Sequence, residues 1–280
     1  MAILGAGRMG QGLALALEGA GRGVLLVSRT SHPVVSPLAP YAGSRAEAVR
    51  ASEVVMLAVP DRAITPVAAE LAAEGAVEER HVVLHLSGLL DRTALAPLAT
   101  TGAGLGSLHP LQTVADPTEA PARLRGAYAG VEGDERALTT AKQLATALGM
   151  TPVVIPPSAK VAYHAGATFA ANYTTVLAFV AERLAVAAGV EPELARRLYL
   201  PLIRGAAASL DSGPAAALTG PVRRGDAETV AAHLAALPPD DRALYVLLAR
   251  EALHLARNAG LAPEAEARLV RVLEDGGPRG

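Results

Sequence analysis

Three glycines near the start of the chain have the spacing of a turn that holds phosphate groups. A short apolar run ends at Leu4, Gly5, Gly7 and Gly10 follow, and a helical pattern begins at once. The first glycine permits a sharp turn, the second lets a pyrophosphate approach the backbone, and the third lets helix and strand pack closely. The helix N-terminus adds free N–H groups and the positive end of its dipole. We therefore predict that a dinucleotide binds to Gly5, Ala6, Gly7, Arg8, Met9 and Gly10.

The end of the second predicted strand bears on which dinucleotide binds. NAD-binding folds place an acidic residue about 20 positions beyond the glycines, where it accepts the ribose 2′-OH. No Asp or Glu lies between Glu18 and Glu47, and Arg29 stands there between two hydroxyl side chains. A guanidinium pairs well with a 2′-phosphate, so Ser28, Arg29 and Thr30 predict NADP(H). The alternative is a solvated surface arginine.

Polar residues on a long helical segment supply candidate chemistry. His164, Thr168 and Asn172 recur every four residues and so form one slowly drifting row on a helix. Imidazole, with an unperturbed pKa near 6.5, suits proton transfer. His164 and Asn172 would lie roughly 12 Å apart along the axis, so only adjacent members of the row can share a substrate. We predict His164 as proton donor and Asn172 as orienting residue, with the roles open to exchange.

Two further residues could act beside this row. His109 comes at the end of a predicted strand and is followed by Pro110; it is a rival acid or an anion clamp. Lys160 lies one turn before His164 and either raises the positive potential for an anionic substrate or is only a solvated helix start. Each histidine could instead be a hydrogen-bonded core residue. The candidate catalytic residues are therefore His164, Asn172, His109, Thr168 and Lys160.

Two buried strands are expected to end near the reacting part of the cofactor. Apolar runs at 54–59 and 81–86 predict parallel strands, whose carboxyl ends should lie over a bound dinucleotide. His81 and His85 share one face of the second run, and we interpret them as structural. The residues expected to line the nicotinamide side are Ala58, Val59, Pro60, Ser87 and Gly88.

The order of the elements predicts a two-domain chain. Strands alternate with helices over residues 1–155, which predicts a doubly wound, mostly parallel, Rossmann-like α/β sheet. Residues 156–280 show only helical periodicity and predict an all-α C-terminal domain, whose first helix is expected over 158–188. The stretch 161–181 carries no formal charge and needs cover on several faces, so we predict a homodimer with this helix near the interface rather than a membrane span.

The composition excludes several classes of function. The 280 residues are 51% hydrophobic, enough for a sizeable core, and a net charge of −2 provides no field that attracts nucleic acid. Cysteine is absent, which excludes disulfides, thiolate metal sites and a cysteine nucleophile. No histidines or carboxylates show metal-ligand spacing in the predicted site. No charged segment precedes the first strand, so no signal peptide is expected and a cytoplasmic location follows.

Several stretches resemble the Rossmann-like proteins whose C-terminal part is catalogued as domain of unknown function 2520. The matching stretches are Gly5–Gly10, Leu57–Asp61, Ser107–Gln112, Val131–Asp134, Tyr163–Ala165, Asn172–Tyr173 and Leu218–Asp226. The resemblance implies an NADP-dependent oxidoreductase. More distantly, the layout is similar to ketopantoate reductases, β-hydroxyacid dehydrogenases, pyrroline-5-carboxylate reductases and prephenate dehydrogenases. The chain departs from the β-hydroxyacid dehydrogenases at Thr168, where those enzymes carry their general-acid lysine.

Two functions remain open at this point. The first is an NADPH-dependent reductase that acts on a carbonyl or imine of a small, anionic metabolite, with the protein orienting the cofactor and supplying a proton. The second is a catalytically inactive NADP(H) sensor or scaffold, because a fold by itself does not establish catalysis. The loop Thr219–Asp226 is a candidate lid or substrate clamp, through Thr219 and Arg224. Neither nucleic acid nor a membrane is expected as a partner.

Overall fold

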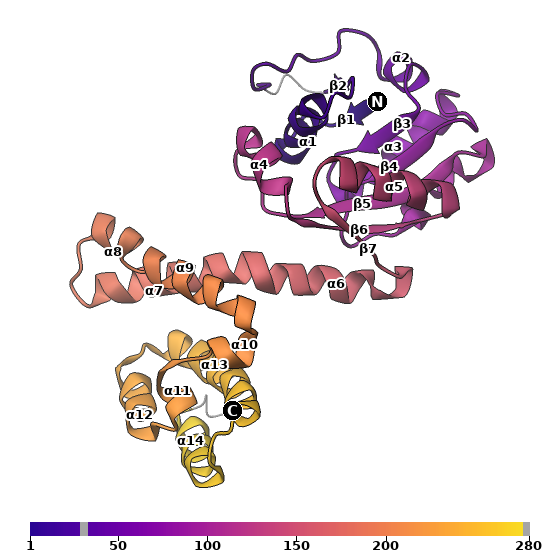
Figure 1. Ribbon diagram of the computed structural model, residues 1–280. Helices are drawn as coiled ribbons and strands as arrows, with labels where there is room; N and C mark the ends of the chain where they lie inside the picture. The colour runs from indigo at the N-terminus through magenta and orange to yellow at the C-terminus, as the bar shows by residue number, and fades with distance from the viewer. Residues whose placement is uncertain (29–32, 277–280) are drawn as a thin grey trace. The chain divides into compact units, whose positions relative to one another are not determined.

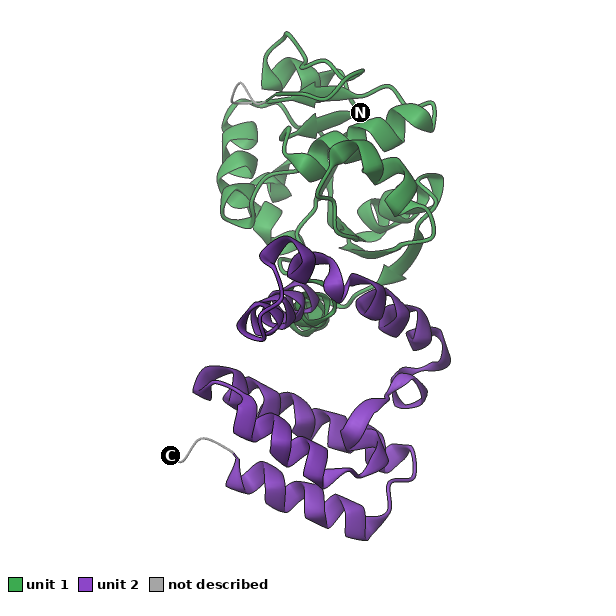
Figure 2. Cartoon of the chain, turned by 90° about the vertical axis from the view of Figure 1, so that its left-hand side faces the viewer, with its two compact units in different colours: residues 1–172 green, residues 173–280 purple. Residues whose placement is uncertain are grey.

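The computed structural model describes residues 1–28 and 33–276, and the chain divides into two compact units. Unit 1 is Met1–Asn172 and unit 2 is Tyr173–Gly280, drawn in green and purple in Figure 2. The last strand ends at Val154, close to the predicted domain boundary at residue 155. The compact units divide later than that, so unit 1 also contains the start of the long helical segment, with Lys160 and His164.

Unit 1 is built on a seven-stranded sheet with the strand order β2-β1-β3-β4-β5-β6-β7 (Figure 1). The strands are β1 (Ala2–Leu4), β2 (Leu25–Val27), β3 (Val54–Leu57), β4 (Val82–His85), β5 (Gly104–Leu111), β6 (Tyr128–Gly133) and β7 (Thr151–Val154). Neighbouring strands are parallel, except that β5 and β6 are antiparallel. The predicted fold class, a mostly parallel Rossmann-like sheet followed by a helical region, is confirmed.

Apolar layers cover both faces of the central strands of this sheet. Successive side chains of a strand point to opposite faces, so Met56 packs in one layer, and Val55 and Leu57 pack in the other. The helical elements that complete the first layer are α1 (Arg8–Gly19), η2 (Pro117–Glu119), α4 (Ala120–Leu124) and α5 (Glu135–Ala147); those of the second are α2 (Arg45–Arg50), α3 (Asp61–Ala73) and η1 (Arg92–Thr101). This double cover explains why the strands read as nearly continuous apolar runs.

The prediction of one continuous α-helix over residues 158–188 is wrong. A 3₁₀ turn, η3 (Pro157–Ala159), leads into α6 (Lys160–Ala167); a π-helical segment, η4 (Thr168–Tyr173), follows, and α7 (Thr174–Ala187) resumes the α-helix. A π-helix bonds residue i to i+5 rather than i+4, so the rotation per residue changes within it. The predicted row of polar residues at i, i+4 and i+8 is therefore not one face of a regular α-helix.

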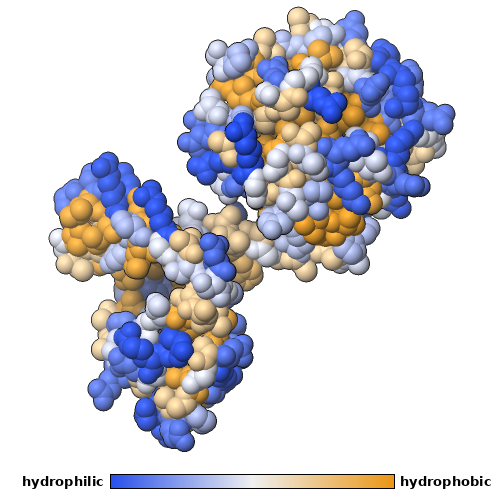
Figure 3. Space-filling model, viewed as in Figure 1, coloured by the Kyte–Doolittle hydropathy of each residue, from blue (hydrophilic) through white to orange (hydrophobic). Residues whose placement is uncertain are grey.

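The described residues of unit 2 contain helices and loops only. After α7 come α8 (Pro192–Leu198), α9 (Leu200–Ser209), η5 (Leu210–Ser212), α10 (Pro214–Ala217), α11 (Gly220–Arg224), α12 (Ala227–Ala236), α13 (Pro239–Asn258) and α14 (Pro263–Asp275). Apolar side chains of α11 to α14 form its core, among them Val230, Leu253 and Leu269. Helices α7 to α9 instead carry many exposed apolar side chains, and apolar surface over this segment is visible in Figure 3.

Candidate active site

The glycine turn is tightly packed at two of its glycines and open at the third. Gly5 has φ +121°, and a Cβ there would lie 2.3 Å from the carbonyl oxygen of Ala58. A Cβ on Gly10 would lie 2.0 Å from the carbonyl oxygen of Gly5, so neither position admits a side chain. At Gly7 nothing lies within 4 Å of an added Cβ. The space beside Gly7 is thus left open by the protein itself, as the close approach of a pyrophosphate requires.

Helix α1 begins directly after Gly7, and no side chain of the described residues caps its N-terminus. Its first turn leaves N–H groups without intrahelical partners at the positive end of the dipole. Gln11 secures this turn, because its buried amide donates to the carbonyls of Ala6 and Pro33 and accepts from the N–H of Val35. These residues fit a dinucleotide pyrophosphate. Sequence reasoning missed Gln11, whose loop partners lie more than 20 residues away.

A cavity of about 780 Å³ opens beside the glycine turn. The predicted cofactor-binding residues that line it are Gly5, Ala6, Gly7, Ser28, Ala58, Val59 and Pro60. Arg8, Met9 and Gly10 lie in the first turn of α1. Arg29 and Thr30, on which the predicted preference for NADP(H) depends, fall outside the described residues.

The same cavity is lined by an ion-pair cluster that sequence reasoning missed. Arg45 pairs with Glu70 of α3 and with Glu74, the residue directly after α3, and all three residues line the cavity. Glu70 lies in the last turn of the helix after β3 and Glu74 directly follows that helix, whereas the acidic residue of NAD-binding folds is expected at the end of β2. Two carboxylates and one guanidinium leave a net negative charge. The cavity therefore carries negative charge on this part of its wall.

The structure brings the two predicted catalytic histidines together at the edge of the sheet. His109 lies near the end of β5, His164 lies on α6, and their ring centroids are 6.0 Å apart. Both rings pack over Gly88, where an added Cβ would lie 2.7 Å from Cε1 of His109 and 2.8 Å from Cδ2 of His164. Gly88 follows β4, and β1, β3, β4 and β5 are parallel neighbours. The histidines and the glycine turn therefore lie at the same, carboxyl edge of the sheet, where doubly wound folds bind ligands.

Tyr163 joins this cluster, although sequence reasoning assigned it no role beyond its place in the resemblance. Its Oη lies 2.9 Å from Nδ1 of His109, and the two rings meet edge to face. Burial, helped by the charges of His164 and Lys160, lowers the pKa of His109 to about 4. Burial also raises the pKa of Tyr163. At neutral pH the His109 ring is therefore uncharged and the phenol keeps its proton.

Lys160 is buried, with 2% of its surface exposed, so the alternative of a solvated helix start is wrong. Its Nζ donates to Oγ of Ser107 at 2.8 Å and to the carbonyl oxygen of Ser87 at 3.2 Å. Burial lowers the pKa of Lys160, and nearby carboxylates, chiefly that of Glu132, oppose the shift. The lysine thus joins α6 to β5 and to the loop after β4. Its burial was hidden in the sequence because its acceptors lie 53 and 73 residues away.

The hydroxyl of Ser87, expected on the nicotinamide side, is engaged within the protein. Its Oγ donates to Asp61 at 2.8 Å and accepts from the N–H of Leu89. The N–H of Ser87 in turn donates to Nδ1 of His85. Burial lowers the pKa of His85 to about 4, so this histidine stays neutral and shapes the loop that carries Gly88. The geometry agrees with a structural interpretation of His85.

Thr168 and Asn172 occupy the π-helical segment. The hydroxyl of Thr168 donates to the carbonyl oxygen of His164 at 3.2 Å, so this side chain serves the helix backbone. Asn172 is exposed and is the last residue of unit 1. The alignment with His164 that motivated both residues is not kept through the wider π turn. The orienting role of Asn172 stays a prediction.

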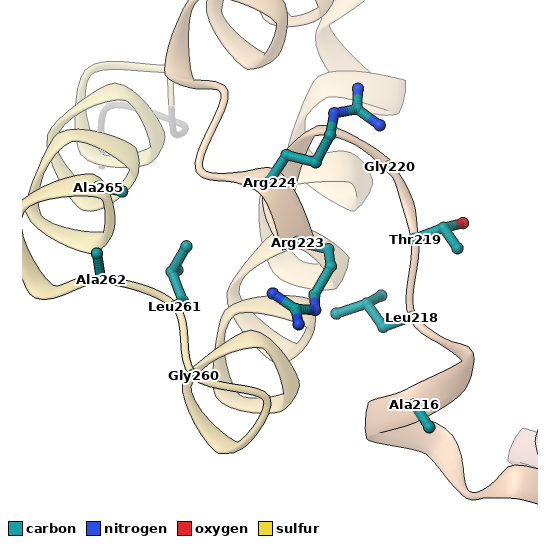
Figure 4. Close-up of a pocket in the computed structure, with 10 residues that line it drawn as sticks. All are labelled: Ala216, Leu218, Thr219, Gly220, Arg223, Arg224, Gly260, Leu261, Ala262 and Ala265. Carbon is teal, nitrogen blue, oxygen red and sulfur yellow. The ribbon is translucent and has the colours of Figure 1, made fainter.

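The loop predicted as a lid, Thr219–Asp226, contains the short helix α11 and lines a cavity of about 680 Å³ in unit 2 (Figure 4). Arg223 points toward Leu218 and Leu261, whereas Arg224 points away from them. The Arg223 guanidinium donates to the carbonyl oxygen of Ala259 at the end of α13. This bond ties the loop to the helical core of unit 2, and the role of the loop as a lid or clamp stays a prediction.

Two further expectations concern metals and membranes. Across residues 1–28 and 33–276, no group of three or more His, Asp or Glu side chains is placed to hold a metal ion. Over the same residues, no helix combines the length and the apolar character that crossing a bilayer requires. The uncharged stretch 161–181 is divided among α6, η4 and α7.

Family profiles cover most of the chain. Residues 1–110 match a family described as "Rossmann-like domain", and residues 127–252 match one described as "Domain of unknown function (DUF2520)". The resemblance predicted from the sequence is therefore confirmed: the chain joins a Rossmann-like domain to a domain of the DUF2520 type. A search of curated proteins finds no match.

Solved structures share this fold over nearly the whole chain. A proposed NADP oxidoreductase from Bacteroides fragilis is 21% identical, covers 90% of this chain and 97% of its own, and has a TM-score of 0.71. A Thermotoga maritima protein is 25% identical, with 98% of each chain covered and a TM-score of 0.60. Pyrroline carboxylate reductase from Plasmodium falciparum, solved with NADP bound, is 14% identical, with 99% and 97% covered and a TM-score of 0.60. At such identities the likeness to the two oxidoreductases shows a shared fold.

Proposed function

We propose that this chain is an NADPH-dependent oxidoreductase that reduces the carbonyl or imine carbon of a small, anionic metabolite. The observation that carries the proposal is the pair His109 and His164, packed over Gly88 at the sheet edge that also holds the glycine turn. The NADP bound to the pyrroline carboxylate reductase of the same fold supports the choice of cofactor. A catalytically inactive NADP(H) sensor is the alternative, because binding and turnover are separate properties.

NADP(H), when bound, supplies or accepts a hydride. The first turn of α1 would hold its pyrophosphate through backbone N–H groups beside the open position at Gly7. Arg29 would pair with the 2′-phosphate. Ala58, Val59 and Pro60 would line the path of the dinucleotide along the strand ends.

The histidine pair would handle the proton that reduction requires. Hydride addition leaves negative charge on the substrate oxygen or nitrogen, and a positioned acid neutralises it. We assign His164 as the proton donor, while His109, uncharged at neutral pH, hydrogen-bonds the same atom. The ring spacing of 6.0 Å lets one substrate atom reach both side chains. The buried charge of Lys160 adds positive potential, which favours an anionic substrate and the developing charge.

The cofactor assignment is tested by calorimetric titration with NADPH and NADH. We expect Arg29→Ala to weaken NADPH binding roughly tenfold or more and to leave NADH binding nearly unchanged, because a charge-assisted hydrogen bond contributes about 1.5–3 kcal/mol. Arg22→Ala, at an exposed arginine beyond α1, serves as the matched control and should change neither affinity. Equal losses for both cofactors would show that Arg29 does not select the 2′-phosphate.

Catalysis is tested by following NADPH consumption with a panel of small carbonyl and imine acids. With a substrate found, His164→Ala should lower turnover by about 10²–10⁴-fold at nearly unchanged NADPH affinity. His254→Ala, at an exposed histidine of unit 2, should be silent. If the His109→Ala and His164→Ala variants both fold and keep full activity, the proton comes from another group. Tight NADPH binding without turnover of any panel member would favour the sensor.

We further propose that the chain forms a homodimer through α7, α8 and α9. These helices expose large apolar side chains, including Phe179, Leu194 and Leu202. Large apolar side chains exposed on neighbouring segments of the chain are typical of an interaction site. A second copy of the chain is the occupant that the sequence predicts.

A further inference from the structure

The Tyr163 side chain lies close to Gly130 of β6 and to the ring of His109. It precedes His164 on α6, so its side chain leaves the helix about 100° away from that of His164. Its ring centroid is 5.6 Å from that of His109, with the ring planes inclined by 87°. In this arrangement its Oη reaches Nδ1 of His109 at 2.9 Å, while His164 approaches the same histidine from another side.

Strand β6 is shaped to receive the Tyr163 phenol. Gly130 is paired with His109 across β5 and β6, and a Cβ on Gly130 would lie 2.6 Å from Oη and 2.8 Å from Cζ of Tyr163. Only glycine therefore leaves room for the phenol at this point. Because burial raises the pKa of Tyr163, the phenol keeps its proton at neutral pH, and its O–H is available to donate to Nδ1 of His109.

We propose that Tyr163 is a positioning residue that sets the tautomer of His109. The phenol O–H donates to Nδ1, so the single ring proton of the neutral imidazole resides on Nε2 and is the donor presented to the substrate. A neutral histidine carries one ring proton, and the partner of one nitrogen decides which nitrogen holds it. The tautomer is a property of the protein alone; its use on a substrate rests on the function proposed above.

The surroundings of His109 keep its ring neutral at pH 7, and only a neutral ring has two tautomers. The titratable groups that act on the ring are His164 and Lys160, which disfavour its protonation, and Asp61, which favours it, together with the Tyr163 phenol. Burial outweighs the favourable charge, so the ring is uncharged at pH 7. A ring that were doubly protonated would need no tautomer control, because both of its nitrogens would be donors.

The competing interpretation is that Tyr163 only fills space beside Gly130. Phenylalanine would fill nearly the same space, so Tyr163→Phe separates packing from hydrogen bonding. Unit 2 supplies a matched control, because Tyr245 and His233 form a second pair with Oη 3.0 Å from Nδ1. Tyr245→Phe removes the same chemical group in a place to which we assign no function.

The test is long-range ¹⁵N NMR of the histidine side chains at pH 7, which distinguishes the two neutral tautomers and the charged ring. His109→Gln assigns the His109 signals. We expect the Nε2–H tautomer of His109 in the wild type and in Tyr245→Phe, and a shift toward Nδ1–H in Tyr163→Phe. An Nδ1–H tautomer in the wild type would overturn the proposal even if Tyr163→Phe failed to fold. An unchanged tautomer in a folded Tyr163→Phe variant would overturn it as well.

Kinetics then separate this inference from the proposed function. With a substrate found, Tyr163→Phe should lower kcat on the order of 10²-fold, because a misplaced donor loses its near-attack geometry, while NADPH affinity stays the same. Tyr245→Phe should leave both unchanged. If no substrate turns over, the proposed function fails, and the NMR result still decides the role of Tyr163. A full shift of tautomer with unchanged kcat would show that His109 is not the group presented to the substrate.

Discussion

A tyrosine–histidine pair of nearly the same geometry occurs in each unit. In unit 1, Oη of Tyr163 lies 2.9 Å from Nδ1 of His109, with ring centroids 5.6 Å apart. In unit 2, the values for Tyr245 and His233 are 3.0 Å and 5.7 Å. The second pair joins the exposed His233 of α12 to the half-buried Tyr245 of α13, whereas the first lies at a strand end, with His109 packed over Gly88. The hydrogen bond alone therefore does not carry the site that we propose at His109; the proposal also rests on the burial of that ring, on the charges near it and on its position at the sheet edge.

The units also differ in how their apolar side chains are covered. In unit 1, helices bury both faces of the central strands, and Met56, Leu57 and Leu84 have no exposed surface. The edge strand β7 is less covered, since Val153 and Val154 are exposed. In unit 2, by contrast, the side chains of Phe179 and Leu202 are 58% and 69% exposed. Burial of apolar area contributes roughly 25 cal/mol per Å², so a second surface that covers these side chains stabilises the resulting complex.

The first prediction places a charge on this exposed face. Leu202 lines a groove of about 480 Å³ between α7 and α9. We expect Leu202→Glu to weaken the dimer by roughly 2 kcal/mol or more, about thirtyfold, because a buried unpaired charge at an interface is strongly unfavourable. Sedimentation velocity at micromolar concentration measures it. Leu247→Glu on α13, 61% exposed in the wild type, is the control and should remain dimeric. A monomeric wild-type protein would refute the proposed assembly.

The second prediction concerns how the stability of the folded protein depends on pH through His109. The pKa of His109 is about 4 in the folded protein and near 6.5 in the unfolded chain, so between these values the unfolded state binds more protons. Stability should therefore fall as pH falls from 6.5 to 4, by up to about 3 kcal/mol from this group. Urea unfolding of His109→Gln should show a flatter pH profile than the wild type. Identical slopes for wild type and His109→Gln would contradict the assignment.

The third prediction concerns the room that Gly130 leaves for Tyr163. An added methyl group would lie 2.6 Å from Oη, so Gly130→Ala should reduce the free energy of unfolding by about 1–3 kcal/mol. In a Tyr163→Leu background, which removes the phenol, the same substitution should cost clearly less. Chemical denaturation of the four proteins gives the coupling energy. Additive effects would mean that Gly130 is needed for a reason other than the phenol.

Several features of this protein could be predicted from short stretches of sequence. The glycine turn, the alternation of strands and helices in unit 1 and the helical character of unit 2 follow from local spacing and periodicity. The tight packing at Gly5 and Gly10 and the open space at Gly7 agree with the separate roles expected for them. Local patterns succeed here because a turn, a strand or a helix is decided mainly by residues close together in the chain.

Other features were decided only by the tertiary structure. The sequence around Lys160 is typical of a charged helix start. In the structure this lysine is buried and donates to Ser107 and to the carbonyl oxygen of Ser87. The spacing of the polar residues from His164 to Asn172 predicts one helix face, but a π-helical segment interrupts the α-helix there. Tyr163 meets His109 across 54 residues of sequence. The physical reason is the same in each case: burial, hydrogen-bond partners and pKa depend on groups that strand order and register bring together, and no local pattern encodes that register.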